Sequence, residues 1–218
     1  QGVDDVASAA TAMKPRMIRL VPNAEEIGAS AEELPTPLPS VEILVPLRDE
    51  WQVLRPCLDS IVAFTPWPGL RLTLLDDGSD AFTQARLAQF TAATPQLAVR
   101  TLRNERALGF VQNANRGLAA SDADFVVLLN SDTIVTPGWL ERLVGAALSD
   151  PRIAAAMPMS NQASLHSLAI PMGWNLFQYA AALGSKMKRT CFDVVTASGF
   201  CLLLRRDAVR DVGVFDEI

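Results

Sequence analysis

The sequence contains little histidine and little cysteine, and each scarcity excludes a class of function. His166 is the only histidine among the 218 residues, which excludes any mechanism that needs two histidines. The three cysteines are widely spaced and form no Cys-x-x-Cys pair, so neither a zinc site nor a disulfide framework is indicated. Free cysteines fit a reduced setting, so we expect a cytoplasmic location, which includes the inner face of the membrane.

Long apolar runs and an excess of positive charge are also missing. No run of 18 apolar residues occurs, so we expect no transmembrane segment in this chain. The formal net charge of −5 at pH 7 argues against nucleic acid as a partner. The chain begins with Gln and has no basic-then-apolar signal peptide, so we interpret it as a piece of a longer protein with further domains.

The first 40 residues differ in composition from the rest. They are dominated by Ala, Ser, Glu and Pro, and the proline-rich stretch at 35–39 is typical of a stiff, extended segment. A short helix is predicted over 24–34. We therefore interpret residues 1–40 as a linker or an N-terminal appendage, and residues 41–218 as one folded domain.

Strand and helix patterns alternate along this domain. We predict strands at 41–46, 70–75, 97–102 and 125–129, and helices at 50–64, 80–92, 111–120 and 137–148. Four such repeats are typical of parallel βαβ units, so the fold class is α/β, with a mostly parallel sheet and helices on both faces. Beyond them we predict a strand at 153–157, helices at 174–186 and 206–212, and a strand pair or a bent strand within 194–204, interrupted at Ser198-Gly199.

The stretch from Phe125 to Asp132 organises the rest of the chain. Its five apolar residues predict a strand that is covered on both faces. Asn130 and Asp132 follow that strand and, being two apart, point the same way on extended backbone. Their oxygen atoms suit Mg²⁺ or Mn²⁺, which usually also hold a substrate diphosphate. The alternative is a polar turn that closes the strand.

Three of the predicted strands end in polar, turn-prone clusters. These are Arg48-Asp49-Glu50, Asp76-Asp77-Gly78-Ser79 and Asn130-Ser131-Asp132. Because the carboxyl ends of parallel strands share one edge of the sheet, we expect the clusters to converge on one crevice. The pattern therefore predicts a nucleotide-binding geometry.

Several short motifs occur in an order that resembles the family 2 glycosyltransferases, which have the GT-A fold, a Rossmann-like arrangement. The motifs are Val-Pro-x-Arg-x-Glu at 45–50, Leu-Asp-Asp-Gly-Ser at 75–79, Asn104 with Gly109-Phe110-x-x-Asn113-x-Asn115-x-Gly117, Leu-Asn-Ser-Asp-Thr at 129–133, Ser198-Gly199-Phe200 and the run 213–217. The resemblance covers residues 41–218. The subgroup that it matches best is the bacterial rhamnosyltransferase-like enzymes, which build surface polysaccharides.

The resemblance implies roles for particular residues. It implies that Asp132, together with Asn130, binds Mn²⁺ or Mg²⁺, with Asn130 standing where the family usually has an Asp. Asp77 corresponds to the residue that accepts a hydrogen bond from the nucleotide base. The nucleotide-sugar-binding set implied by the match is Pro46, Leu47, Arg48, Glu50, Asp77, Gly78, Asn104, Gly109, Asn115, Asn130 and Ser131. For Asn115, which lies on a predicted helix, packing within the fold is the alternative.

The reaction implied by the resemblance is transfer of a sugar, with inversion, from a nucleotide-diphosphate sugar to a glycan or lipid-linked acceptor. Inversion needs a carboxylate base, which the family carries beyond the position of Ile218. The domain is therefore expected to be incomplete at its C-terminus, and nucleotide binding rather than turnover is expected of these 218 residues. The alternatives are a non-catalytic nucleotide-sugar-binding or scaffold module and, less favoured because the loop at 46–50 has no glycine, a sugar nucleotidyltransferase.

Overall fold

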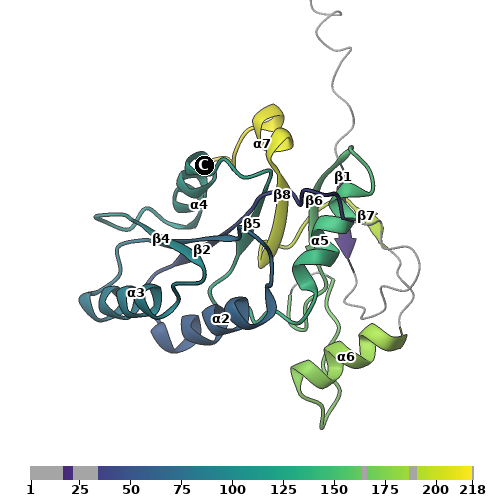
Figure 1. Cartoon of the computed structure of the whole chain (residues 1–218), viewed down its shortest axis with the longest axis horizontal. Helices are drawn as coiled ribbons and strands as arrows, with labels where there is room; N and C mark the ends of the chain where they lie inside the picture. Colours follow the sequence, from purple (N-terminus) through teal and green to yellow (C-terminus); the bar gives the residue numbers. More distant parts are fainter. Residues whose placement is uncertain (1–16, 22–33, 164–165, 187–190, 218) are drawn as a thin grey trace, which may run out of the picture.

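The computed structural model describes residues 17–21, 34–163, 166–186 and 191–217 (Figure 1). The helix predicted at 24–34 lies almost entirely outside these ranges. No helix within the described ranges is long and apolar enough to cross a membrane.

The described residues build one eight-stranded sheet in the order β4-β3-β2-β5-β8-β6-β1-β7. The strands are β1 (Met17–Val21), β2 (Val41–Leu47), β3 (Arg71–Asp76), β4 (Ala98–Arg103), β5 (Phe125–Leu129), β6 (Ile153–Pro158), β7 (Phe192–Val194) and β8 (Cys201–Arg205). The pairs β2–β3, β3–β4, β2–β5 and β1–β6 are parallel, whereas β8 runs antiparallel to β5 and β6, and β7 to β1. The prediction of a mostly parallel α/β sheet is confirmed.

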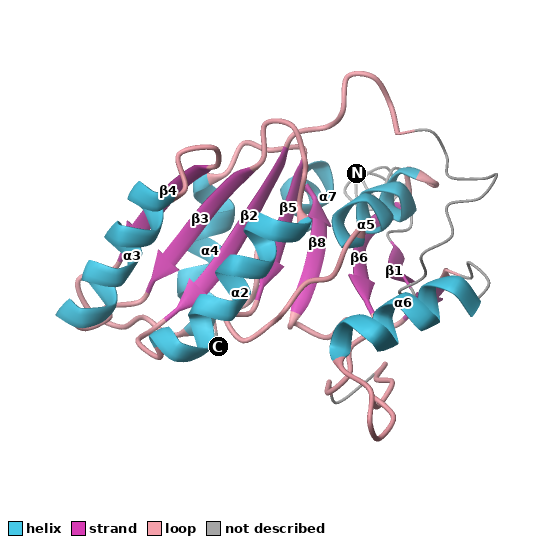
Figure 2. Ribbon diagram, turned by 60° about the horizontal axis from the view of Figure 1, so that its bottom comes forward, coloured by secondary structure: helices cyan, strands magenta, loops and turns pink. Residues whose placement is uncertain are grey.

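Helices cover both faces of this sheet (Figure 2). They are α2 (Trp51–Phe64), α3 (Ala81–Ala93), α4 (Phe110–Ala120), α5 (Trp139–Leu148), α6 (Leu176–Lys186) and α7 (Arg206–Val212). Helices α2, α3 and α5 lie on one face, and α4 and α7 lie on the other.

The alternation of side chains along β2 explains why both of its faces are covered. Ile43 and Val45 are fully buried in the cluster that contains Leu54 and Leu58 of α2. Leu44, between them, belongs to a second buried cluster on the α4 side. Successive strand residues point to opposite faces, so a continuous apolar strand needs helices on both sides.

The strand order fixes where a ligand can bind. From β2 the chain runs to β3 and then β4 on one side, whereas β5 pairs with the other side of β2. Open α/β sheets bind ligands outside the carboxyl ends of the strands at such a switch point. The carboxyl ends of β2, β3 and β5 carry the three predicted polar clusters.

Part of the predicted appendage lies in the sheet. Strand β1 pairs in parallel with β6, from Ile18 opposite Ala155 to Val21 opposite Pro158, and β7 pairs with its other side. Residues 17–21 are therefore a strand of the domain's own sheet.

A buried ionic cluster joins the strands near their amino ends, which is the opposite end of the sheet from the predicted polar clusters. The fully buried Glu42 carboxylate accepts hydrogen bonds from Ser121 Oγ at 2.7 Å and from Arg100 Nη2 at 2.8 Å. Burial raises the pKa of Glu42, but hydrogen bonds from Thr73, Ser121 and Arg100 outweigh it and lower the pKa below its ordinary value. The cluster is paired throughout and lies at the amino ends of the strands, so its role is structural.

Helix α4 approaches the sheet closely at Gly117, which generates a stability prediction. A Cβ at this position would lie 2.6 and 2.9 Å from the two Cδ atoms of Leu75 and 3.0 Å from Leu44 Cδ1. Because both leucines are fully buried, we expect Gly117→Ala to lower the free energy of unfolding by about 1–3 kcal/mol through overpacking. Urea denaturation measures this change.

Gly145 of α5 is the matched control. A Cβ there meets no atom within 4 Å, so Gly145→Ala should raise the free energy of unfolding by about 0.5–1 kcal/mol through helix propensity. Equal effects of the two substitutions would contradict the close packing of α4 on β2 and β3.

Candidate functional site

Three hydrogen bonds donated by backbone N–H groups hold the loops after β2 and β3 together. Asp77 N–H donates to Leu47 O at 2.9 Å, Asp49 N–H to Ser79 Oγ at 2.9 Å, and Asp80 N–H to Asp49 Oδ1 at 2.7 Å. Asp49 and the next residue, Glu50, have left-handed φ values of 55° and 51°, which non-glycine residues adopt at an energetic cost. The bonds to the β3 loop hold this strained turn in place.

The residues of the predicted nucleotide loop differ in how far they are exposed to solvent. The Arg48 side chain is 61% exposed at the carboxyl edge of the sheet, and Glu50 is also exposed. Pro46 is half-buried. Leu47 is only 4% exposed and packs in the core, so its backbone, rather than its side chain, faces the loop.

The Asp77 carboxylate joins the β3 loop to the loop that precedes α4. Its Oδ1 accepts from Leu108 N–H and from Asn104 Nδ2, both at 2.8 Å, and its Oδ2 accepts from Gly109 N–H at 2.9 Å. Three residues of the predicted binding set, Asp77, Asn104 and Gly109, are therefore brought into direct contact.

Gly78 permits this contact. Its φ is +79°, and a Cβ there would lie 3.1 Å from Ala107 N and 3.2 Å from the carbonyl carbon of Arg106. The two loops thus pack backbone against backbone, and only glycine combines the positive φ with so close an approach.

The environment of Asp77 favours its charged form. Burial alone raises the pKa of this carboxyl, which is 7% exposed. The hydrogen bonds from Leu108, Asn104 and Gly109, together with the positive charge of Arg48, outweigh burial and lower the pKa below its ordinary value. Asp77 is therefore an anion that holds a loop.

The Asn104 side-chain amide forms hydrogen bonds with other residues of the protein. Its Nδ2 also donates to Asn113 Oδ1 at 3.0 Å, and its Oδ1 accepts from Arg116 Nη1. Asn113 Nδ2 in turn donates to Leu75 O at 2.8 Å. Asn104 thereby supports Asp77 from behind.

Asn115 lies apart from these residues. Its Oδ1 accepts from Phe215 N–H at 2.9 Å, and its Nδ2 donates to Phe215 O at 2.8 Å and to Glu217 Oε1 at 3.2 Å. The Asn115 side chain therefore joins α4 to the C-terminal segment, as the packing alternative predicts, and its place in the nucleotide-sugar-binding set stays a prediction.

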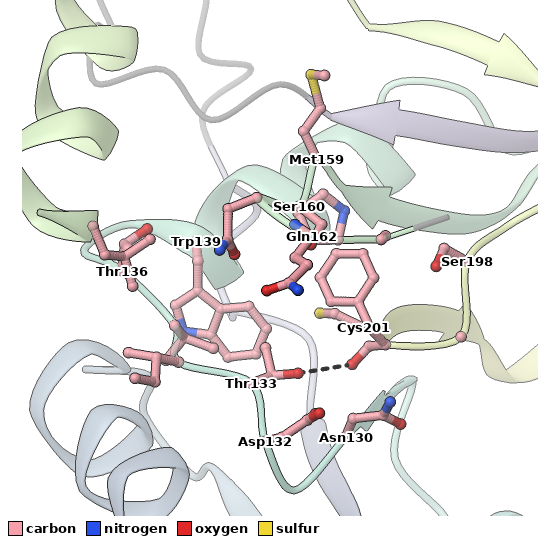
Figure 3. Close-up of a pocket in the computed structure, with 18 of the residues that line it drawn as sticks. Asn130, Asp132, Thr133, Thr136, Trp139, Met159, Ser160, Gln162, Ser198 and Cys201 are labelled. Carbon is pink, nitrogen blue, oxygen red and sulfur yellow. Dashed lines mark hydrogen bonds between the residues drawn. The ribbon is translucent and has the colours of Figure 1, made fainter. Parts of the chain in front are cut away.

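A cavity of about 930 Å³ opens beside the carboxyl end of β5. Asn130 and Asp132 lie side by side on its wall, where Asn130 is half-buried and Asp132 is exposed (Figure 3). Ser131, between them, is half-buried and is not a lining residue. Of the predicted binding set, this cavity therefore gathers the two candidate metal ligands.

The donor atoms at this wall fit a divalent cation whose shell is only partly supplied by protein. Asp132 and Asn130 offer a carboxylate and a carboxamide oxygen, which are the hard ligands that Mg²⁺ and Mn²⁺ accept. Among the described residues no group of three or more His, Cys, Asp or Glu side chains is arranged to hold a metal. A phosphate-bearing ligand and water would supply the remaining oxygens.

The other lining residues are mostly hydroxyl, amide and aromatic side chains. They include Phe110, Thr133, Thr136, Trp139, Ser160, Asn161, Gln162, Ser198 and Phe200. Sequence reasoning assigned none of these to a site. Two sequence features could have pointed to some of them: Ser198-Gly199 interrupts a strand pattern, and Phe110 directly follows Gly109. The 158–163 segment carries no recognisable pattern.

The two buried thiols at this cavity, Cys201 in its lining and Cys57 on α2, are not nucleophiles. Burial, and then the negative charge of Asp132, raise the pKa of Cys57 to about 12 against the opposing effect of Thr133 N–H. Burial also raises the pKa of Cys201. Both thiols therefore stay protonated at neutral pH.

The three hydrogen bonds to Asp77 predict how a neutral replacement behaves. Asp77→Asn puts an amide N–H₂ opposite a backbone N–H, so we expect a loss of about 1–3 kcal/mol in the free energy of unfolding. Amide hydrogen exchange at Leu108 and Gly109 should accelerate. Because the folded-state pKa of Asp77 is lowered, its contribution is complete above the ordinary pKa of about 3.9 and disappears as pH falls through the lowered value.

The difference in stability between wild type and Asp77→Asn should therefore shrink in acid. Asp80→Asn is the control for hydrogen exchange, because Asp80 caps α3 by accepting from Thr83 N–H at 2.7 Å and asparagine also caps, so exchange at Leu108 and Gly109 should keep its wild-type rate. A pH-independent difference, or unchanged exchange at Leu108 and Gly109, would refute the assigned role of Asp77.

Comparisons with known proteins agree with this geometry. The family described as Glycosyl transferase family 2 matches residues 42–213. The pre-mycofactocin glycosyltransferase of Mycobacterium tuberculosis is 30% identical over 187 residues, which cover 81% of this chain and 36% of the relative. Cellulose synthase 1 of Komagataeibacter xylinus is 27% identical over 192 residues, covering 83% of this chain and 12% of the relative. The chain thus spans about a third or less of these relatives' lengths.

Solved structures share the fold. The mannosyltransferase PcManGT from Pyrobaculum calidifontis, in complex with GDP-Man and Mn²⁺, matches with a TM-score of 0.61 and 18% identity, over 82% of this chain and 48% of that one. S. aureus TarS 1-349, in complex with UDP-GlcNAc, matches with a TM-score of 0.58 and 14% identity, over 81% of this chain and 48% of that one. These likenesses confirm the predicted GT-A fold.

Proposed function

Because the chain belongs to glycosyl transferase family 2, we propose that it moves a sugar, with inversion, from a nucleotide-diphosphate sugar to a glycan or lipid-linked acceptor in surface polysaccharide synthesis. One observation carries the proposal. Asp132 and Asn130 stand at the carboxyl end of β5, on the opposite side of β2 from the Asp77 loop, and they line a cavity of about 930 Å³. A diphosphate held there would join a nucleotide on one side to a sugar on the other.

We assign the nucleotide to the side of Asp77 and the Pro46–Glu50 loop. Asp77 Oδ2 accepts one protein hydrogen bond, and a carboxylate oxygen can accept two, which supports a further bond from a base N–H. The exposed Arg48 guanidinium suits the negative charge of a nucleotide. Asn104, Gly78 and Gly109 act in this proposal by shaping the loops rather than by touching the ligand.

We assign a divalent cation, Mn²⁺ or Mg²⁺, to Asp132 and Asn130. Two structural neighbours support the assignment: PcManGT is in complex with GDP-Man and Mn²⁺, and GalNAc-T7 with UDP, GalNAc and Mn²⁺. When bound, such an ion neutralises the charge that develops on a departing nucleoside diphosphate. Asp132 would anchor it by charge, and Asn130 would orient it through a neutral oxygen.

The sugar and the acceptor are assigned to the cavity. Hydroxyl and amide side chains such as Thr136, Gln162 and Ser198, beside the rings of Phe110 and Trp139, suit the polar edges and apolar faces of sugars. Relatives named cellulose synthase support a role in polysaccharide synthesis.

Nucleotide binding is the first test of the proposal, because all the residues assigned to the nucleotide and the metal lie within the ranges that the structure describes. We expect one of UDP, dTDP and GDP to bind more tightly with Mn²⁺ than without it in calorimetric titrations. Asp132→Asn should abolish the metal-dependent part of the affinity, since it removes the charged ligand while keeping the shape of the side chain.

Asp59→Asn is the matched control. Asp59 is an exposed residue on α2 that pairs with Arg55 Nε at 2.7 Å, so its replacement should leave the metal dependence unchanged. If none of the three nucleotides binds the folded wild-type chain, or if Asp132→Asn retains the full effect of Mn²⁺, the donor-site proposal is wrong.

A further inference from the structure

Helix α2 contacts the candidate metal loop, residues 130–135, at both of its ends. At the beginning of the loop, Cys57 Sγ donates to Asn130 O at 3.6 Å. At its end, Val135 N–H donates to Ser60 Oγ at 3.1 Å. One face of α2 therefore spans the loop from the first candidate ligand to the residue where the chain turns toward α5.

The two α2 residues are themselves linked. Ser60 Oγ donates to Cys57 O at 2.7 Å while it accepts from Val135, so its hydroxyl is used in both directions. Cys57 is fully buried and Ser60 is 5% exposed. Water cannot readily replace either contact, and a buried N–H that loses its acceptor is costly.

The other side of the loop is held by backbone. Asn130 N–H donates to Phe200 O at 2.8 Å, and Thr133 Oγ1 donates to the same oxygen at 3.3 Å (Figure 3). The loop is thus clamped between Phe200 and α2, and Asn130 and Asp132 project from the clamped segment into the cavity.

The same helix begins in the predicted nucleotide loop. Glu50 O accepts from Val53 N–H at 2.9 Å and from Leu54 N–H at 3.1 Å, which starts α2 directly after the strained turn at Asp49. Helix α2 runs for 14 residues, with Pro56 inside it, and therefore connects the nucleotide side with the metal side of the site.

We propose that Ser60 and Cys57 are positioning residues that hold the 130–135 loop in the geometry in which Asp132 and Asn130 bind the cation. The inference rests on the proposed function. Neither residue touches the ligand, so each acts only through the loop. Residues that orient metal ligands from behind commonly change metal affinity when they are replaced.

The test compares the metal enhancement, which is the ratio of nucleotide affinity with Mn²⁺ to that without it. The probe is whichever of UDP, dTDP and GDP the wild type binds most tightly. We expect Ser60→Ala and Cys57→Ala each to lower the enhancement by about tenfold, while the affinity without metal stays near the wild-type value. Exchange of the Val135 amide should accelerate in Ser60→Ala.

Ser121→Ala is the matched control. Ser121 is likewise a buried serine whose hydroxyl donates once, to Glu42 Oε2 at 2.7 Å, and accepts a backbone N–H, from Ala123 at 3.3 Å. Ser121 lies near the amino ends of the strands, far from the metal loop at their carboxyl ends. Ser121→Ala should therefore lower thermal stability without changing the metal enhancement.

Each outcome bears on a different claim. Unchanged enhancement in folded Ser60→Ala and Cys57→Ala would overturn the positioning role while the proposed function stands. A fall in Ser121→Ala equal to that in Ser60→Ala would also overturn it, because general destabilisation would then explain the effect. Absence of nucleotide binding by the wild type would overturn the proposed function, and the positioning role with it.

Discussion

The carboxylate of Asp77 is the contact on which the shape of the crevice depends. It accepts the backbone N–H groups of Leu108 and Gly109 and the side-chain amide of Asn104, and so fixes the loop that leads into α4. Its own backbone N–H is tied to Leu47 O. Asp77 thereby links the ends of β2, β3 and β4 through its backbone and its carboxylate, while Ser79 and Asp80 of the same loop hold the left-handed turn at Asp49.

The metal side of the site depends on β5 and α2 instead. Strand β5 is buried along its whole length, which gives Asn130 and Asp132 a fixed origin, and Cys57 and Ser60 hold the loop from behind. The two halves meet across β2, where the strand order reverses. A ligand with a base at one end, a diphosphate in the middle and a sugar at the other end matches this division.

Sequence patterns predicted the strands and helices around β2 to β5, because apolar runs and helical spacing depend on local residues. Helix α7 begins and ends at the predicted residues 206 and 212. The pairing of β1 with β6 and the contacts of Asn115 with Phe215 were not predictable in this way, since they join residues far apart in sequence. The contact of Asp77 with Gly109 was not predicted, although the resemblance placed both residues in one binding set. Nine of the nineteen residues that line the cavity lie in the segments 158–163 and 198–200, which carry no periodic pattern.

Nuclear magnetic resonance of the labelled chain with nucleotide and Mn²⁺ tests the central claim most directly, because the paramagnetic ion broadens the amide signals nearest to it. We expect broadening centred on residues 130–133 when Mn²⁺ is added with nucleotide, and none with diamagnetic Mg²⁺. We also expect nucleotide to shift the signals of Arg48, Leu108 and Gly109. Broadening centred elsewhere, or nucleotide-induced shifts confined to another face of the sheet, would contradict the proposed site.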